Sequence, residues 1–195
     1  MADYPNTVPA FTLLVNNVHD VLAAHQNTPN AEIEAIATDL GAGPNRRILP
    51  LAARYKTAAA QSIPGGNFTI VDFGTLVYDT HSAVTVGAAW KFTAPVAGYY
   101  FVSAAILFAA TTTWSDTDYG SLILYVNNAA SSYLDRKDSY GSASSVYMRL
   151  GGSTVVLLAA ASYLDIRIYQ VSGGALALLN DAGYNQISIA RVGAG

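Results

Sequence analysis

The sequence predicts an all-β domain built as a sandwich or barrel, and three observations support this prediction. From residue 68 onwards, short segments rich in aromatic and β-branched residues follow one another without a helical period between them. Turn-forming sequences such as Pro64-Gly65-Gly66 and Asn127-Asn128 separate these segments. No internal sequence repeat is evident, which disfavours a propeller and leaves the sandwich or barrel.

The segment 90–108, WKFTAPVAGYYFVSAAILF, is expected to organise the domain. It indicates two strands joined by a corner, in which Pro95 fixes φ and Gly98 leaves the backbone free to take a positive φ. The second strand, expected over 99–110, lacks the charges that an amphipathic helix would carry on its outer face. We therefore expect a buried central strand here.

Shorter strands are expected on both sides of this central segment. The turn Gly151-Gly152 is expected to divide two of them, and the Ala-rich segment 48–61 is expected to end in the first strand of the domain. The other expected strands cover 68–71, 75–78, 83–86, 90–93, 121–126, 132–135, 144–150, 154–158, 163–170 and 186–192.

The composition is unusually apolar, since 52% of the 195 residues are hydrophobic and only 12% are charged. No uninterrupted apolar stretch approaches the roughly 20 residues that a transmembrane helix needs, so self-association is the expected way to cover the apolar surface. The formal net charge of −3 provides no basic field for nucleic acid. The absence of cysteine excludes disulfides, thiol nucleophiles and thiolate metal sites.

The sequence FTAPVAGYYF, residues 92–101, is followed by an apolar strand and resembles the core motif of the globular heads of complement component one q. Those heads share a jelly roll with the TNF-like trimers. Segments 70–80 and 163–192 fall where that family places its flanking strands, so the resemblance covers about 53–192. It implies a jelly-roll β-sandwich that assembles as a homotrimer and serves binding, not catalysis.

Two short amphipathic helices are expected in residues 1–47, which end in a turn-rich linker. The sequence VLAAHQNTPNAEIEAIATDLGAGPN resembles a stretch near the amino termini of bacteriophage tail-fibre and minor tail proteins, and the resemblance covers about 16–45. It implies a helical virion-attachment segment over 1–47, followed by the jelly-roll head over 48–195. The apolar residues expected to make the attachment are Phe11, Leu14, Val18, Leu22, Ile33, Ile36 and Leu40.

Loop residues provide two candidate sites. Asp116 and Asp118 form an Asp-x-Asp pair in a polar loop and are candidate Ca²⁺ ligands, because Ca²⁺ prefers oxygen donors; no other cofactor is expected. Aromatic residues in loops can stack on sugar rings or anchor a protein partner, or they can instead pack in a trimer interface or cap the sandwich edge. The candidate host-contact residues are Trp114, Tyr119, Tyr133, Arg136 and Tyr140.

Strand 163–170 alternates between apolar residues on one side and aromatic or charged residues on the other. In a trimer the second side is a natural place for contacts between subunits, as the resemblance to the complement-like family implies. The candidate trimer-interface residues are Tyr99, Phe101, Tyr163, Arg167 and Tyr169.

These features lead us to expect a non-enzymatic bacteriophage structural protein, namely a trimeric tail-fibre or tail-tip protein that presents a binding head to the host surface. The expected partners are its own copies, other virion proteins, and a glycan or protein of the host surface, without nucleic acid or membrane insertion. The first residues lack the basic and apolar regions of a signal peptide. We therefore expect assembly in the host cytoplasm and a final place on the surface of the phage particle.

Three alternatives stay open. A capsid decoration protein or head fibre would use the same architecture at another place on the particle. A polysaccharide-degrading tail enzyme is disfavoured because the sequence offers no repeat-built β-helix and no pair of carboxylates suited to glycoside cleavage. A free ligand of the cytokine type is disfavoured by the missing signal peptide and by the phage-like helices.

Overall fold

The computed structural model describes residues 50–111, 114–139 and 146–195, and all regular structure in these ranges is β. Within them no helix is long and apolar enough to cross a membrane. The two expected helices and the expected domain boundary between residues 47 and 48 lie outside these ranges and stay predictions. So do the attachment roles of Phe11, Leu14, Val18, Leu22, Ile33, Ile36 and Leu40.

The strands follow one another with short connections between most of them. In chain order they are β1 Ala52–Lys56, β2 Ser62–Ile63, β3 Thr69–Ile70, β4 Thr75–Asp79, β5 Val84–Thr85, β6 Lys91–Thr93, β7 Gly98–Leu107, β8 Tyr119–Val126, β9 Ala129–Asp138, β10 Arg149–Leu158, β11 Tyr163–Val171, β12 Leu176–Ala177 and β13 Gln186–Gly193.

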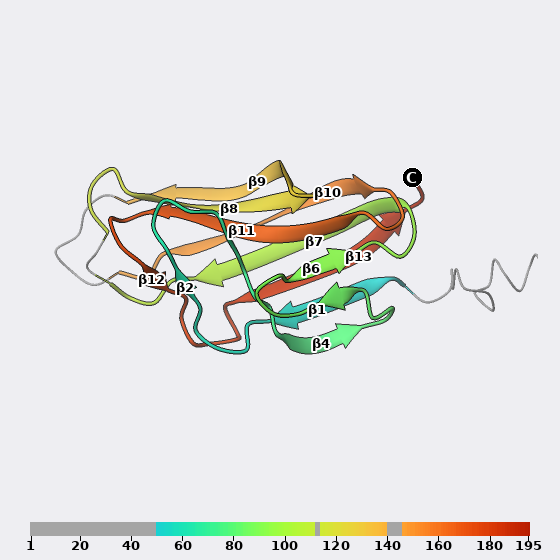
Figure 1. Cartoon of the computed structure of the whole chain (residues 1–195), viewed down its shortest axis with the longest axis horizontal. Coiled ribbons are helices and arrows are strands. Elements are labelled where there is room, and N and C mark those ends of the chain that lie inside the picture. The colour runs from blue at the N-terminus through green and yellow to red at the C-terminus, as the bar shows by residue number, and fades with distance from the viewer. Residues whose placement is uncertain (1–49, 112–113, 140–145) are drawn as a thin grey trace, which may run out of the picture. The chain divides into compact units, whose positions relative to one another are not determined.

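Two antiparallel sheets form a sandwich (Figure 1). The five-stranded sheet has the order β10-β7-β13-β1-β4. The six-stranded sheet has the order β5-β6-β11-β8-β9, with β3 paired to β11 beside this path, and β2 pairs with β12 separately. Because β13 lies between β7 and β1, strands from opposite ends of the described chain are neighbours.

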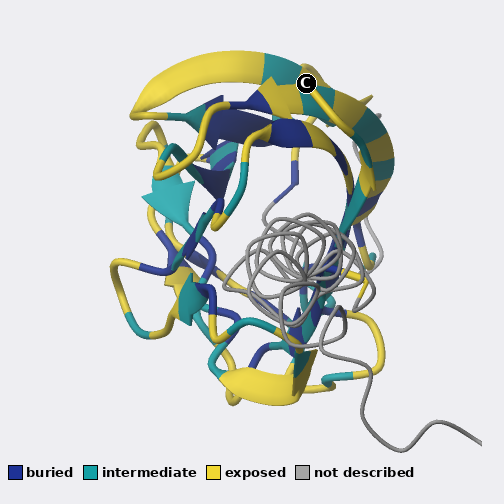
Figure 2. Ribbon diagram, turned by 90° about the vertical axis from the view of Figure 1, so that its right-hand side faces the viewer, coloured by how far each residue is buried: buried dark blue, intermediate teal, exposed yellow. Residues whose placement is uncertain are grey.

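The inner faces of both sheets share one hydrophobic core, and Figure 2 shows buried segments on the inside of the sandwich. On β7 the alternation expected of a strand is plain, because Tyr100, Val102 and Ile106 are buried in this core. Tyr99 and Phe101 lie on the opposite side of β7 and are exposed. The expected long strand at 99–110 is thus confirmed as β7, although only one of its faces is buried.

The turn expected at Asn127-Asn128 is confirmed as the two-residue connection between β8 and β9. The φ angles of the two asparagines are 48° and 66°, so both lie in the left-handed region. A pair of positive φ angles gives a turn whose twist matches that of the flanking strands, and asparagine tolerates it better than most residues. This turn sets the register of the β8–β9 hairpin.

The turn expected at Gly151-Gly152 is wrong. Strand β10 runs through both glycines and pairs with β7 along its whole length. A Cβ atom at Gly152 would collide with the carbonyl oxygen of Leu134 on β9, so glycine permits a close approach of two strands here and does not make a turn. The Gly151 N–H donates to Asp135 Oδ2 at 2.9 Å, which also links β10 to β9. These contacts join the edge strands of the two sheets.

The first strand also differs from its expected position. Segment 48–61 has its strand, β1, in the middle and not at the end. The side chains of Ala53 and Tyr55 alternate into the core, and Tyr55 packs edge-on against Trp90 with ring centroids 6.3 Å apart. The following residues, 57–61, are mostly alanine and connect β1 to β2 without adding to the sheet.

Candidate functional site

A row of four aromatic rings lies on the outer face of the six-stranded sheet. The ring centroids of Tyr125 and Phe68 are 6.0 Å apart, those of Phe68 and Tyr169 4.8 Å, and those of Tyr169 and Tyr119 6.0 Å. We call these four residues the aromatic row. Because β8, β11 and the segment before β3 each contribute to it, the row depends on the folded sheet.

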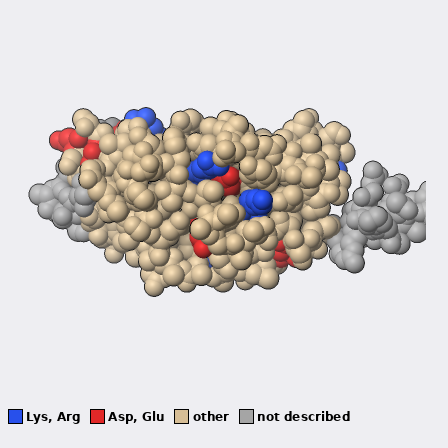
Figure 3. Space-filling view, viewed as in Figure 1, with Lys and Arg blue, Asp and Glu red and all other residues tan. Residues whose placement is uncertain are grey.

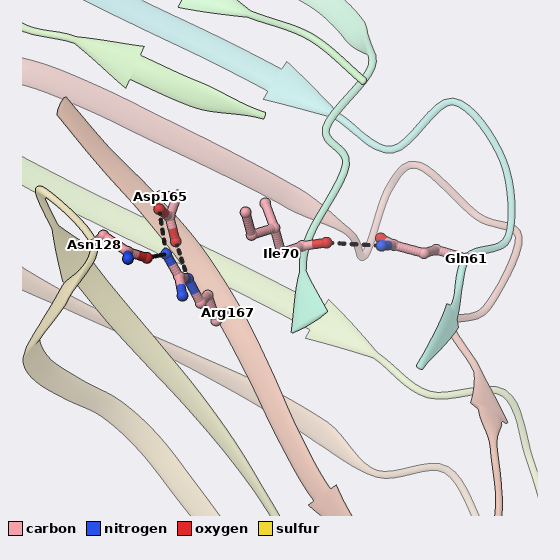
Figure 4. Close-up of polar contacts among 5 residues, drawn as sticks. All are labelled: Gln61, Ile70, Asn128, Asp165 and Arg167. Atoms are coloured by element: carbon pink, nitrogen blue, oxygen red, sulfur yellow. Dashed lines mark hydrogen bonds and ion pairs between the residues drawn. The ribbon is translucent and has the colours of Figure 1, made fainter. Parts of the chain in front are cut away.

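Arg167 lies over the Tyr125 end of the aromatic row, with its Cζ atom 3.9 Å from the ring centroid. Its Nε atom is 2.7 Å from Asp165 Oδ1, and its Nη2 atom donates to Asn128 Oδ1 at 2.6 Å (Figure 4). The hydrogen bond to the buried Asp165 raises the pKa of the Arg167 guanidinium. The charge at this end of the row is therefore satisfied within the chain.

Arg136 lies over the opposite end, with its Cζ atom 3.8 Å from the Tyr119 ring centroid. Its Nη2 atom is 2.9 Å from Asp138 Oδ1, and this hydrogen bond raises the pKa of the Arg136 guanidinium. The ion pair borders a pocket of about 270 Å³, which we call the aromatic pocket. The pocket is lined by Phe68, Tyr119, Ser121, Ile123, Tyr133, Arg136 and Tyr169.

The register of three strands assembles the aromatic pocket. Ser121 on β8 is opposite Tyr169 on β11 and opposite Arg136 on β9, and Ile123 on β8 is opposite Tyr133 on β9. Ser121 and Ile123 are buried although they do not belong to the central core, so they form the floor of the pocket. Tyr133 is 67% exposed and forms part of the rim. The result is an open, mainly aromatic concavity with one ion pair at its border.

A second feature lies on the outer face of the five-stranded sheet. Tyr99 on β7 is paired with Leu157 on β10, and Phe101 is paired with Val155, and all four side chains are exposed. Ala190 on β13 lies beside Phe101 and continues this surface. We call Tyr99, Phe101, Val155 and Leu157 the apolar face. It is a contiguous patch, because its members form two cross-strand pairs that are two residues apart on the same two strands.

The structure brings together Tyr119, Tyr133 and Arg136, three of the candidate host-contact residues, at the aromatic pocket. Their expected position in loops is wrong, because Tyr119 begins β8 and the other two lie on β9. The exposed position expected for Trp114 is wrong, because this side chain is 2% exposed and packs edge-on against Phe108 in the core. Its large apolar ring favours burial in the core over exposure to solvent, although the residue lies in the connection before β8. Tyr140 lies outside the described residues.

Asp116 and Asp118 lie in the connection before β8. Asp118 Oδ2 accepts a hydrogen bond from the Ser115 N–H at 2.7 Å, which is an ordinary role for an aspartate in a turn. In the described part of the chain, no group of three or more His, Cys, Asp or Glu residues could hold a metal ion. The Ca²⁺ site therefore stays a sequence-based prediction.

The five candidate trimer-interface residues fall into two groups on different sheets. Tyr99 and Phe101 belong to the apolar face of the five-stranded sheet. Tyr163, Arg167 and Tyr169 lie on β11 of the six-stranded sheet, and each has a partner in its own chain. Lys91 Nζ, for example, lies 5.2 Å from the Tyr163 ring centroid. The outer faces of a sandwich point away from each other, so one flat contact surface cannot include both groups.

Several residues of these surfaces were not expected from the sequence. The sequence predicts a strand at 68–71 without indicating a site role for Phe68, and a short strand at 154–158 without indicating a role for Val155 and Leu157. Residues 155–158 form a continuous apolar run, so the sequence does not show that Val155 and Leu157 face outwards; this direction follows from the pairing with β7. Phe68 has no local signal, because its role depends on the neighbouring β8 and β11.

The fold is similar to that of two solved structures. Eiger TNF from S. frugiperda superposes with a TM-score of 0.56 at 15% sequence identity, covering 75% of this chain and 94% of that chain. Murine APRIL at pH 5.0 superposes with a TM-score of 0.51 at 13% identity, covering 73% of this chain and 99% of that chain. The described domain is a TNF-like jelly roll.

No protein-family model and no curated protein matches this sequence. The similarity to the Eiger TNF and APRIL structures confirms the jelly roll expected from FTAPVAGYYF. At these sequence identities the similarity concerns the fold alone. The homotrimer and the phage-like amino-terminal segment stay predictions.

Proposed function

We propose that this chain is a non-enzymatic structural protein of a bacteriophage particle, whose jelly-roll heads associate as homotrimers and present the outer surface of the six-stranded sheet to the host. The apolar face carries the proposal of self-association. The resemblance of residues 16–45 to tail-fibre and minor tail proteins supports the place on a tail fibre or tail tip, with residues 1–47 as the attachment segment. The TNF-like fold is compatible with a role in binding.

The apolar face supports self-association because of its composition and continuity. Single exposed hydrophobic residues are normal, but two aromatic and two aliphatic side chains on adjacent strands form a patch of the kind that marks a protein interface. Charged side chains are few and scattered on the molecular face that Figure 3 shows, which agrees with the 12% of charged residues in the sequence. Covering the apolar face with copies of the same chain would remove this surface from water.

A matched pair of valine substitutions tests the homotrimer. Val155 on the apolar face is 54% exposed, and Val86, which follows β5 in the other sheet, is 51% exposed. The wild-type chain and the Val86→Glu variant are expected to have a mass near three times the 20.5 kDa of one chain, by light scattering at micromolar concentration. Val155→Glu is expected to dissociate, because it places a charge in the interface. A wild-type mass of one chain would reject the proposal.

The place on a particle needs its own experiment. Mass spectrometry of purified phage should find the chain, and electron microscopy of antibody-labelled particles should locate it on the tail; label on the capsid would instead show a decoration protein or head fibre. Release of shortened glycans from host polysaccharide would identify the alternative of a degrading enzyme.

A free ligand of TNF type is the second candidate, because the two similar structures named above are of Eiger TNF and of APRIL. Absence of the chain from purified particles would favour this candidate.

A further inference from the structure

We propose that the aromatic pocket binds one pyranose ring of a neutral carbohydrate. This inference rests on the proposed function in one respect only, namely that the six-stranded sheet faces outwards in the trimer. The pocket and the apolar face lie on the outer faces of different sheets, so association through the apolar face leaves the pocket open.

The size and lining of the pocket favour a single sugar ring. Its volume of about 270 Å³ is just below the roughly 300–1,000 Å³ of sites for drug-sized molecules. Tyr133 and Phe68 are both at least half exposed, so their rings offer apolar surface to a ligand. A pyranose ring presents a face of C–H groups that stacks on such a ring, and an aromatic side chain loses little conformational entropy when it binds.

The polar groups of the pocket suit hydroxyl groups. The Arg136 guanidinium offers N–H donors, and the Ser121 hydroxyl can donate and accept. Asp138 does not line the pocket, but its carboxylate is paired with Arg136 and adds acceptors beside the lining residues. Two neighbouring sugar hydroxyls also act as donor and acceptor together. Because Asp138 already holds Arg136 at 2.9 Å, the pair can receive hydroxyls without any change in its own geometry.

The pairing of Arg136 also argues for a neutral sugar and against an acidic one. Arg136 is the cation among the described residues that line the pocket, its charge is matched by Asp138, and its planar face lies on Tyr119. A sugar carboxylate would have to displace Asp138 or lie beside it, and two carboxylates close together repel each other. A neutral ring meets neither obstacle.

Binding by one pocket is expected to be weak, since few groups contact the ligand, and three copies on one trimer would strengthen attachment to a surface that carries many identical glycans. The direct test is saturation-transfer NMR of the full chain with the methyl glycosides of glucose, galactose, mannose and N-acetylglucosamine, together with the sodium salts of glucuronic and N-acetylneuraminic acid.

Tyr133→Ala tests the pocket, and Tyr147→Ala is the matched control, because Tyr147 is 61% exposed and does not line the pocket. We expect at least one neutral glycoside to give transfer that Tyr147→Ala retains and that Tyr133→Ala and Arg136→Gln each weaken about tenfold or more. Circular dichroism of each variant verifies the fold.

The possible results separate this inference from the proposed function. A trimer by light scattering without transfer to any neutral glycoside would overturn the neutral-sugar site and leave the proposed function intact. Transfer only to the acidic sugars, or transfer that Tyr133→Ala leaves unchanged, would also overturn it. Transfer with the expected dependence on Tyr133 in a chain that is monomeric would support the site and reject the homotrimer.

Discussion

Replacement of Asn185 by alanine should destabilise the domain more than its polar side chain suggests. Asn185 has an exposure of 0% and lies where the ladder between β7 and β13 ends, since Gln186 and Ala105 are the last pair. Its Oδ1 atom accepts a hydrogen bond from the Leu107 N–H at 2.7 Å, and its Nδ2 atom donates to the Leu179 carbonyl at 2.6 Å. One amide side chain thus replaces backbone pairing at the end of a central strand.

The expected loss can be worked out from these two contacts. The Leu107 N–H would be left buried without this partner, which costs about 1–3 kcal/mol. The Leu179 carbonyl still accepts the Asp181 N–H at 2.8 Å, so its lost bond costs only about 0.5–1.5 kcal/mol. We therefore expect Asn185→Ala to lower the free energy of unfolding by about 2–4 kcal/mol. For a domain of this size the corresponding decrease in Tm is about 5–15 °C.

Differential scanning calorimetry and urea unfolding, at one fixed protomer concentration, measure this loss. The matched control is Asn67→Ala, because Asn67 is exposed and its side chain makes one short-range hydrogen bond, to the Gly65 carbonyl at 3.1 Å. That variant should lose less than about 1 kcal/mol. If Asn185→Ala unfolds within 1 °C of Asn67→Ala, the assignment of a structural role to the buried amide is wrong.

Two further predictions concern a tyrosine and a glycine. Burial, and then the nearby Asp79 with its hydrogen bond, raise the pKa of Tyr55 from 10.0 to about 12, so its contribution to stability is complete below pH 10 and is lost as the pH rises from about 10 to 12. As the pH rises from 10 to 12, the free energy of unfolding measured in urea should therefore fall less for Tyr55→Phe than for wild type, by at most about 2.7 kcal/mol. Parallel curves of unfolding free energy against pH for the two proteins would contradict this. Gly152→Ala should destabilise the domain by about 1–3 kcal/mol, because the added Cβ atom would meet the Leu134 carbonyl. The control Gly174→Ala should have little effect on urea unfolding, because no heavy atom lies within 4 Å of the added Cβ atom. Equal urea midpoints for the two variants would contradict the close approach of β10 and β9.

Much of the strand content could be predicted from local sequence, because β7 is a nearly continuous run of apolar and aromatic residues, β11 alternates in side-chain type, and Asn127-Asn128 is a strong turn signal. The wrong turn prediction at Gly151-Gly152 arose because glycine occurs both in turns and in strands that approach another strand closely. Gly151-Gly152 has the local signature of a turn, but the close approach of Leu134 from β9 can be known only once the sheets are assembled. Sequence pattern identifies strands well and neighbours poorly.

For the candidate site, too, the sequence indicated neighbours along the chain but not neighbours that depend on strand pairing. Tyr119, Tyr133 and Arg136 lie together because they belong to one hairpin, where proximity along the chain is also proximity in space. Tyr169 was placed in a different role, because its contact with Tyr119 depends on the pairing of β11 with β8. Burial of a large side chain such as Trp114 depends on the whole core and not on the loop that carries it.

The position of β13 has a consequence for how the protein is made. This strand is the last of the described strands, yet it occupies the middle of its sheet between β7 and β1, so the sheet cannot close until every described strand has left the ribosome. Until then β1 and β7 have unpaired edges, and contacts between such distant segments form slowly. Cooler growth or chaperone coexpression should therefore raise the yield of folded protein, because each slows the clustering of nascent chains before β13 inserts.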